Sequence, residues 1–224
     1  MSANLMSLAR SGGKFLKLYG DRKMVRPLPY LRRVAYLESH GNEWIGTGIY
    51  MSKKEKGSIS IKYKTNSINT ENDPIGNYSS NEHWPHFCFT CDKGRNNLYS
   101  TSWSNWYLNR IDLTVVYEWK LDIGYNLTNR ITVGGDLVFE SSKTKPDTNV
   151  TAVRDFVIGN RGDGRYGFTG RIYHVVFNLS KRFSFIPVLD LSGRPAMYDE
   201  VSGQFFYNQG TGEFTWGELD SQTT

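Results

Sequence analysis

The sequence predicts an all-β fold, and three features of its composition support this prediction. Aromatic residues make up 14% of the 224 residues, glycines number 22, and no long run is rich in alanine, leucine or glutamate. Aromatic residues favour strands, and glycines favour the turns that join them. All-β domains of this length are often single, so we expect one main domain of the sandwich type.

Apolar residues that recur at every second position predict most of the strands. Residues 58–63 alternate in this way, which is typical of a strand with one buried face. Residues 129–140 predict a hairpin, because the pair Gly134-Gly135 supplies the positive φ values of a tight turn. The same alternation predicts strands at residues 31–38, 43–49 and 84–91, and at 112–123, where the buried face is expected to carry Leu113, Val115, Tyr117, Trp119 and Leu121.

Two further strand patterns, joined by a glycine-rich loop, occupy residues 154–179. In the second of them, alternation is expected to place Tyr173, Val175, Phe177 and Leu179 on one face. Glycine permits backbone conformations that are closed to other residues, so the loop can turn tightly. It can also bring its backbone close to a partner.

Residues 160–164 of this loop have two interpretations. Asp163 and nearby backbone carbonyls could bind calcium, or the segment is a plain glycine turn. Calcium takes about six to eight oxygen ligands and usually several carboxylates, so the single carboxylate of Asp163 favours the turn. We therefore expect no metal and no cofactor.

The positive charge is concentrated at the N-terminus. Residues 1–33 carry eight basic residues and one acidic residue, a net +7, whereas the rest of the chain carries 19 basic and 21 acidic residues, a net −2. A basic arm of this kind could dock on an acidic protein surface or on nucleic acid. It is short and has few interleaved aromatic residues, so we expect a protein partner and no dedicated nucleic-acid domain.

The sequence indicates neither export nor membrane insertion. Residues 1–13 lack an apolar core of the length found in secretory signals. No window approaches the roughly 18 apolar residues that cross a bilayer. Cys88 and Cys91 are the only cysteines, and three residues apart in a strand they point to opposite faces, so we expect two reduced thiols. His83 and His86 keep a metal site open as an alternative, with too few ligands for structural zinc.

The run VAYLESHGNEWIGTGI, residues 34–49, resembles the opening of concanavalin A-like, laminin-G-like jelly-roll domains of bacteriophage and gut-bacterial proteins. Such domains often read close to V-x-Y-[IL]-E-S-x-G-x-Q-Y-I-D-T-G-I. The chain departs from this pattern at Glu43 and Trp44, and at Gly46, where the family usually has aspartate, so any role of that aspartate is absent at this position. The matching residues are Val34, Tyr36, Leu37, Glu38, Ser39, Gly41, Ile45, Thr47, Gly48 and Ile49.

Later segments carry the same resemblance. Gly170, Ile172 and Tyr173 match a G-x-I-Y run that commonly leads a late strand of the family. The tail matches F-I-P-V at residues 185–188, M-Y-D-x-V-S-G-x-F at 197–205 and G-T-G-x-F at 210–214. The resemblance implies a concanavalin A-like jelly-roll sandwich with an extended N-terminal arm and a C-terminal hairpin extension packed on it. The expected boundaries are 1–29 for the arm, 30–184 for the sandwich and 185–224 for the extension.

Catalysis by a glycoside hydrolase would require two carboxylates on either side of the scissile bond. Glu118 and Asp122 share one face of a predicted strand, but Lys120 lies between them and a third acid is missing from the usual motif. A solvated strand face explains these residues better than a catalytic pair does. We therefore expect that the protein is not an enzyme.

Sugar binding without catalysis requires an exposed aromatic surface and a few polar groups. Trp103, Trp106 and Tyr107 could supply the surface, with Asn105 and Asp163 as hydrogen-bonding partners. The alternative is that these aromatic side chains fill the core. Trp103 and Trp106 are the better candidates, since their segment is rich in polar residues.

These observations favour a non-enzymatic, lectin-like module of a bacteriophage virion or a related surface assembly. The arm, residues 1–29, is expected to anchor it to other proteins of an oligomeric assembly, and a host glycan is a possible ligand. The alternatives are a purely structural capsid-decoration or tail protein, and a glycoside hydrolase. We expect the protein to be made in the host cytoplasm and located in the virion, with no membrane partner.

Overall fold

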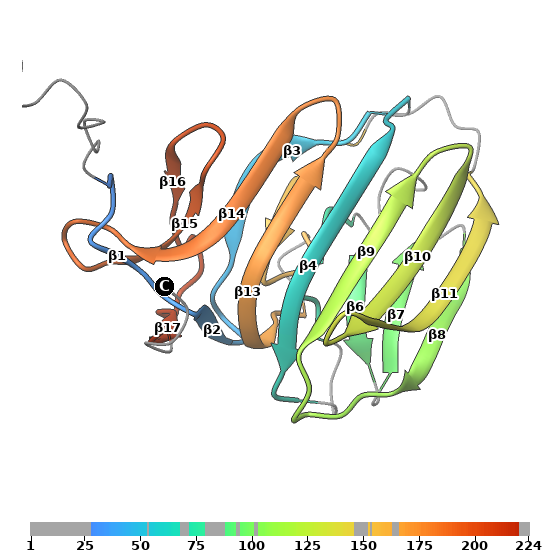
Figure 1. Cartoon of the computed structure of the whole chain (residues 1–224), viewed down its shortest axis with the longest axis horizontal. Coiled ribbons are helices and arrows are strands. Elements are labelled where there is room, and N and C mark those ends of the chain that lie inside the picture. Colours follow the sequence, from blue (N-terminus) through green and yellow to red (C-terminus); the bar gives the residue numbers. More distant parts are fainter. Residues whose placement is uncertain are drawn as a thin grey trace, which may run out of the picture.

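The computed structural model describes residues 28–52, 54–67, 72–78, 88–92, 95–100, 103–145, 152, 154–162 and 166–219; of residues 92, 95–100 and 103–110 it describes the backbone alone. Two antiparallel sheets pack face to face, which confirms the all-β sandwich (Figure 1). No helix among these residues has the length and hydropathy to span a membrane.

The larger sheet has eleven strands. Its main path runs β11-β10-β9-β4-β13-β14-β15-β16, with β1 paired to β14, and with β2 paired to β13 and β17. The bounds are β1 Arg32–Arg33, β2 Tyr36–His40, β4 Gly57–Thr65, β9 Tyr117–Ile123, β10 Asn126–Val133, β11 Asp136–Thr144, β13 Thr169–Asn178, β14 Arg182–Leu189, β15 Pro195–Asp199, β16 Gln204–Phe206 and β17 Thr215–Gly217.

The smaller sheet has six strands in the order β3-β12-β5-β6-β7-β8 and lies behind the larger one in Figure 1. Its strands β3 and β12 come from opposite halves of the chain and pair with each other. The bounds are β3 Ile45–Tyr50, β5 Ile75–Gly76, β6 Cys88–Asp92, β7 Arg95–Ser100, β8 Trp103–Arg110 and β12 Asp155–Ile158.

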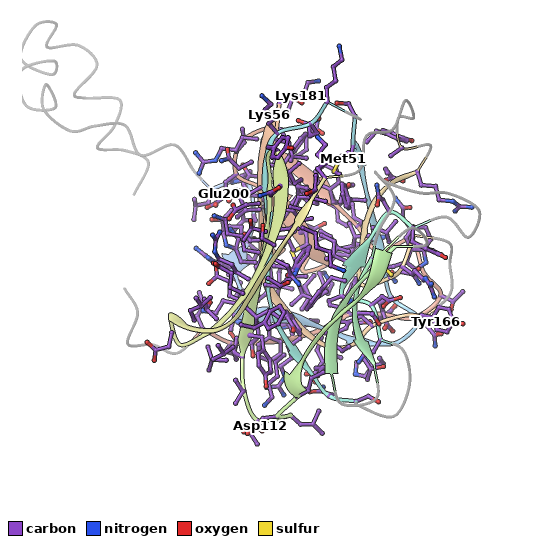
Figure 2. The ribbon with its side chains drawn as sticks, turned by 90° about the vertical axis from the view of Figure 1, so that its right-hand side faces the viewer. Met51, Lys56, Asp112, Tyr166, Lys181 and Glu200 are labelled. Atoms are coloured by element: carbon purple, nitrogen blue, oxygen red, sulfur yellow. The ribbon has the colours of Figure 1, made fainter. Side chains whose placement is uncertain are left out.

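The core lies between the two sheets, where side chains fill the space from the end near Asp112 to the opposite end near Lys181 (Figure 2). Trp119 and Phe89 stack across the interface with 4.6 Å between ring centroids, so the two sheets are joined by aromatic packing. The indole N–H of Trp119 donates to the Oδ1 atom of the buried Asn129. That bond satisfies a polar group where an unsatisfied one would cost about 1–3 kcal/mol.

The predicted hairpin at Gly134-Gly135 is confirmed. These glycines join β10 to β11 with φ values of 60° and 95°. The prediction for residues 112–116 was wrong. Leu113 lies in a turn and is 37% exposed, because the strand begins only at Tyr117.

The predicted buried face of β13 was also partly wrong. A bulge between Ile172 and His174 shifts the register against β4, so Ile172 is buried with Val175 and Phe177. Tyr173 is only half-buried, and its ring meets Tyr36 edge-on at 5.5 Å. A bulge inserts one residue and so reverses the alternation on one side of it.

The C-terminal strands continue the larger sheet. β14 pairs with β13 on one side and with β15 on the other, so the hydrogen-bonded sheet runs unbroken past residue 185. At the other end of the chain, Arg32 and Arg33 pair with the end of β14. The boundaries that we predicted at residues 29 and 184 stay predictions.

Candidate functional site

The sequence-predicted aromatic residues lie on an edge strand. Trp103, Asn105, Trp106 and Tyr107 belong to β8, which ends the smaller sheet beside β7. Their side chains are outside the described part of the structure, and Asp163 is outside it altogether. The structure therefore brings the β8 residues into one strand and leaves their role as a prediction.

A cavity of about 510 Å³ is lined in part by β17. This strand lies at the opposite end of the molecule from β8 in Figure 1. Ligand pockets have volumes of roughly 300–1,000 Å³, so this volume suits a small organic molecule. Three segments line it: the β14–β15 turn, the loop between β16 and β17, and β17 itself. The lining residues are Ser192, Gly193, Arg194, Pro195, Asn208, Gly210, Gly212, Glu213, Phe214 and Trp216. We call it the Trp216 cavity.

Asp190 organises the first of these segments. Its Oδ1 atom accepts hydrogen bonds from the backbone N–H groups of Ser192 and Arg194 and from the Ser192 hydroxyl, and its Oδ2 atom accepts from the Tyr207 hydroxyl at 3.0 Å. The Ser192 hydroxyl and the Arg194 N–H lower the pKa of Asp190 to about 2. The carboxylate thus stays charged and fixes the turn that carries Arg194.

The second segment, the loop between β16 and β17, is hydrogen-bonded to the turn between β2 and β3. The Oδ1 atom of Asn208 accepts from the Trp44 N–H at 3.0 Å, and its Nδ2 atom donates to the Gly212 carbonyl at 2.5 Å. The backbones meet as well, with Gln209 N–H donating to Trp44 O and Thr211 N–H donating to Asn42 O. These bonds hold the loop against the β2–β3 turn.

Glu43 lies beneath this loop. Its carboxylate is buried and accepts from the His40 N–H at 2.6 Å and from the Ser39 hydroxyl at 2.9 Å. Burial opposes its charge, but these hydrogen bonds outweigh burial and hold the pKa of Glu43 below its usual value. A Cβ on Gly212 would lie 1.8 Å from Glu43 Oε1, so glycine is required where the loop crosses the carboxylate.

The cavity presents three side chains with complementary chemistry. Trp216 is 39% exposed and offers an aromatic surface with an indole N–H. The guanidinium of Arg194 is held 4.3 Å above the Tyr207 ring, which restricts its position. Glu213 is exposed and supplies hydrogen-bond acceptors. A polyhydroxylated ligand could stack on the first and form hydrogen bonds with the other two.

Asp155 lies beside the position at which the sequence lacks the family's aspartate. A Cβ on Gly46 would be 3.4 Å from Asp155 Oδ2 and 2.9 Å from Gln209 Oε1. The same Oδ2 atom accepts from the Gly48 N–H at 2.8 Å. A carboxylate from β12 therefore lies near residue 46.

The acidic residues considered for catalysis lie on the outer face of the larger sheet. Asp122 forms ion pairs with Lys120, at 2.8 Å, and with Arg130. Arg130 also pairs with Glu140. A carboxylate bound by two cations suits a solvated strand face, which is how the sequence pattern was interpreted.

The glycine-rich loop packs against its neighbours as far as it is described. A Cβ on Gly162 would lie 3.1 Å from Asn77 Cα, and the guanidinium of Arg161 stacks on Tyr78 at 4.1 Å. Cys88 and Cys91 are both buried and not joined by a disulfide, as predicted. Within the described ranges, no three histidine, cysteine or acidic side chains gather to form a metal site. His83 and His86 lie outside those ranges.

Sequence reasoning missed the Trp216 cavity. Its lining comes from residues 192–195 and 208–216, which meet because β16 pairs with β15 and β17 pairs with β2. One local signal was present: Trp216 stands between Thr215 and Gly217, without the apolar neighbours of a core strand.

The fold is shared with solved structures of low sequence identity. A candidate carbohydrate-binding protein from Bacteroides ovatus superposes with a TM-score of 0.52 at 14% identity, over 85% of this chain and 61% of that one. This chain thus spans less than two thirds of that protein. No protein-family model matches the sequence, and no curated protein does.

Two other solved structures give lower scores. The CBM40 module of a Ruminococcus gnavus IT-sialidase, bound to α2,3-sialyllactose, has a TM-score of 0.43 at 20% identity, over 67% of this chain and 91% of the module. A SAP-like pentraxin from Limulus polyphemus has a TM-score of 0.43 at 12% identity, over 64% and 75% of the two chains.

Proposed function

We propose that this protein is a non-enzymatic carbohydrate-binding module that holds a sugar in the Trp216 cavity. The observation that carries the proposal is the cavity itself: an exposed tryptophan, an arginine and a glutamate line one open space of about 510 Å³. Sugar sites need an aromatic surface and a few polar groups that fix hydroxyls. The Bacteroides ovatus protein of similar fold is described as carbohydrate-binding, which supports the proposal.

The absence of turnover is part of the proposal. Glu213 is the acidic residue in the cavity lining, whereas glycoside hydrolysis needs two carboxylates, one of them protonated. The outer-face acid Asp122 is bound by Lys120 and Arg130. A glycoside hydrolase would release reducing sugar from a polysaccharide panel, and we expect no release.

The proposal is tested by a glycan array followed by calorimetric titration of the best ligand. Truncation of a central aromatic contact typically costs more than 1 kcal/mol, so Trp216→Ala should weaken binding about tenfold or more. Tyr125→Ala is the matched control, since Tyr125 is 85% exposed on the β9–β10 turn. Equal affinities for Trp216→Ala and the wild type would contradict the proposal.

The setting of the module is a further part of the proposal. The basic arm, residues 1–29, would anchor it to an acidic surface of a bacteriophage virion or a related assembly, as its charge suggests. Particles assembled with a chain that lacks residues 1–27 should then contain little of the protein. Normal incorporation of the shortened chain would contradict anchoring by the arm.

A further inference from the structure

The charges around the Trp216 cavity are unequal. Arg194 and Glu213 contribute one charge of each sign to the lining. Two more carboxylates contact lining residues: Asp190 accepts from the Arg194 N–H, and Glu43 lies against Gly212. Hydrogen bonds keep both Asp190 and Glu43 ionised at neutral pH, as their lowered pKa values indicate. Two cations near β17 are already paired with carboxylates, Arg32 with Glu218 at 2.7 Å and Arg171 with Glu38 at 3.2 Å.

Arg194 and Glu213 are both available to a ligand. Among the residues that the structure describes, neither side chain has an oppositely charged partner within 4.0 Å, and they do not pair with each other. A guanidinium only donates hydrogen bonds and a carboxylate only accepts them. A sugar hydroxyl does both, so neighbouring hydroxyls of one ring can satisfy the two groups together.

An acidic sugar would fit this arrangement poorly. Its carboxylate would gain one contact with Arg194 but would also approach Glu213, and it would enter a region where carboxylates outnumber the guanidinium. Like charges a few ångströms apart repel, and between exposed groups such as Glu213 the effect is modest. The excess of carboxylates therefore outweighs the attraction of a single cation.

We infer that the Trp216 cavity selects an uncharged sugar unit. Arg194 and Glu213 form hydrogen bonds with neighbouring hydroxyls of the sugar, and the charge of Glu213 disfavours acidic sugars. This inference rests on the proposed function, because it names the ligand class of the same site. The cavity and the basic arm are then expected to prefer different ligands, because the arm would attract any acidic polymer whatever its structure.

The test compares matched sugars by titration of the full-length protein in 0.15 M salt, where charges farther apart than about 8 Å are largely screened. The ligands are methyl galactoside and methyl galacturonide, and the glucose and mannose pairs of the same kind. Each pair differs by one carboxylate. We expect the neutral member of the preferred pair to bind at least about threefold more tightly.

Two variants make the test specific. Glu213→Gln removes the repelling charge and should raise the affinity for the uronide about three- to tenfold, while its effect on the neutral sugar is smaller. Arg194→Gln should weaken the neutral sugar. Both side chains are on the surface, so circular dichroism should report unchanged folds.

The outcomes distinguish this inference from the proposed function. Tighter binding of the uronide, or no gain of uronide affinity in Glu213→Gln, would overturn the inference and leave carbohydrate binding intact. Binding of no sugar from the array or the pairs would overturn both. Tighter binding of the neutral sugar, with the gain in Glu213→Gln, would support both.

Discussion

The contact between Gly212 and Glu43 gives the sharpest prediction about how the cavity is built. In Gly212→Ala the new Cβ would lie 1.8 Å from Glu43 Oε1, which is 1.6 Å short of the 3.4 Å at which ordinary contact begins. One of the two groups must move. The variant therefore tests whether the buried carboxylate supports the loop that lines the cavity.

Either movement breaks hydrogen bonds. If the carboxylate moves, it loses the bonds from His40 N–H and the Ser39 hydroxyl, which as bonds to a charged group contribute about 1.5–3 kcal/mol each. If the loop moves, it loses three bonds to Asn42 and Trp44, about 1 kcal/mol each. The first route costs about 3–6 kcal/mol and the second about 3 kcal/mol. The cheaper route sets the expected loss at about 3 kcal/mol, which corresponds to about 6–12 °C in Tm for a domain of this size.

Thermal and urea unfolding of Gly212→Ala measure this loss, with Gly124→Ala as the control. A Cβ on Gly124 would be 3.6 Å from its nearest neighbour, Asn126 O, so the control should stay within about 1 kcal/mol of the wild type. In a Glu43→Ala background, Gly212→Ala should cost less than about 1 kcal/mol, because the clashing carboxylate is gone. A Tm within 2 °C of the control, or additive losses in the double variant, would refute the reasoning.

Three further predictions concern stability and the edge strand. Folding lowers the pKa of Glu43 from 4.5. The stabilising effect of its carboxylate is therefore fully present above pH 4.5 and is lost as the pH falls through the folded pKa. The free energy of unfolding of the wild type should drop more than that of Glu43→Gln between pH 5 and pH 3, and parallel pH profiles would contradict this. Asn129→Ala should lower the free energy of unfolding by about 2–3 kcal/mol, because the indole of Trp119 loses its acceptor; a loss below 1 kcal/mol by urea titration would count against it. Trp103→Ala and Trp106→Ala should leave sugar affinity within about twofold if the Trp216 cavity is the site, and a larger loss in calorimetry would move the site to β8.

Local sequence patterns predicted the strands that have one face toward the core along their whole length. Residues 58–63 alternate because one side of β4 faces the core along its whole length, and Gly134-Gly135 makes its turn from its own backbone preferences. At β13 the alternation failed. This strand pairs with both β2 and β4, and the bulge lies in its pairing with β4, which the pattern of a single strand does not contain.

The cavity was harder to predict than the fold because it too depends on contacts between segments that are distant in the sequence. Gly210 and Gly212 belong to a tail motif that was interpreted as a sign of the family, and the structure shows what these glycines do. Each passes against the β2–β3 turn, where a Cβ would lie 1.8 Å from Asn42 O or from Glu43 Oε1. The two segments that carry the family resemblance, near residues 34–49 and 197–214, therefore contact each other in the fold. Trp216 is carried to the cavity by the pairing of β17 with β2, which no local pattern reveals.

The most direct measurement is a map of amide and indole NMR shifts of the full chain during titration with the best neutral sugar. Binding in the Trp216 cavity predicts that the largest shifts belong to the Trp216 indole N–H and to residues 192–194 and 208–214, with residues 103–107 unchanged. Shifts confined to residues 103–107, or no shifts with any sugar that the array identifies, would contradict the account.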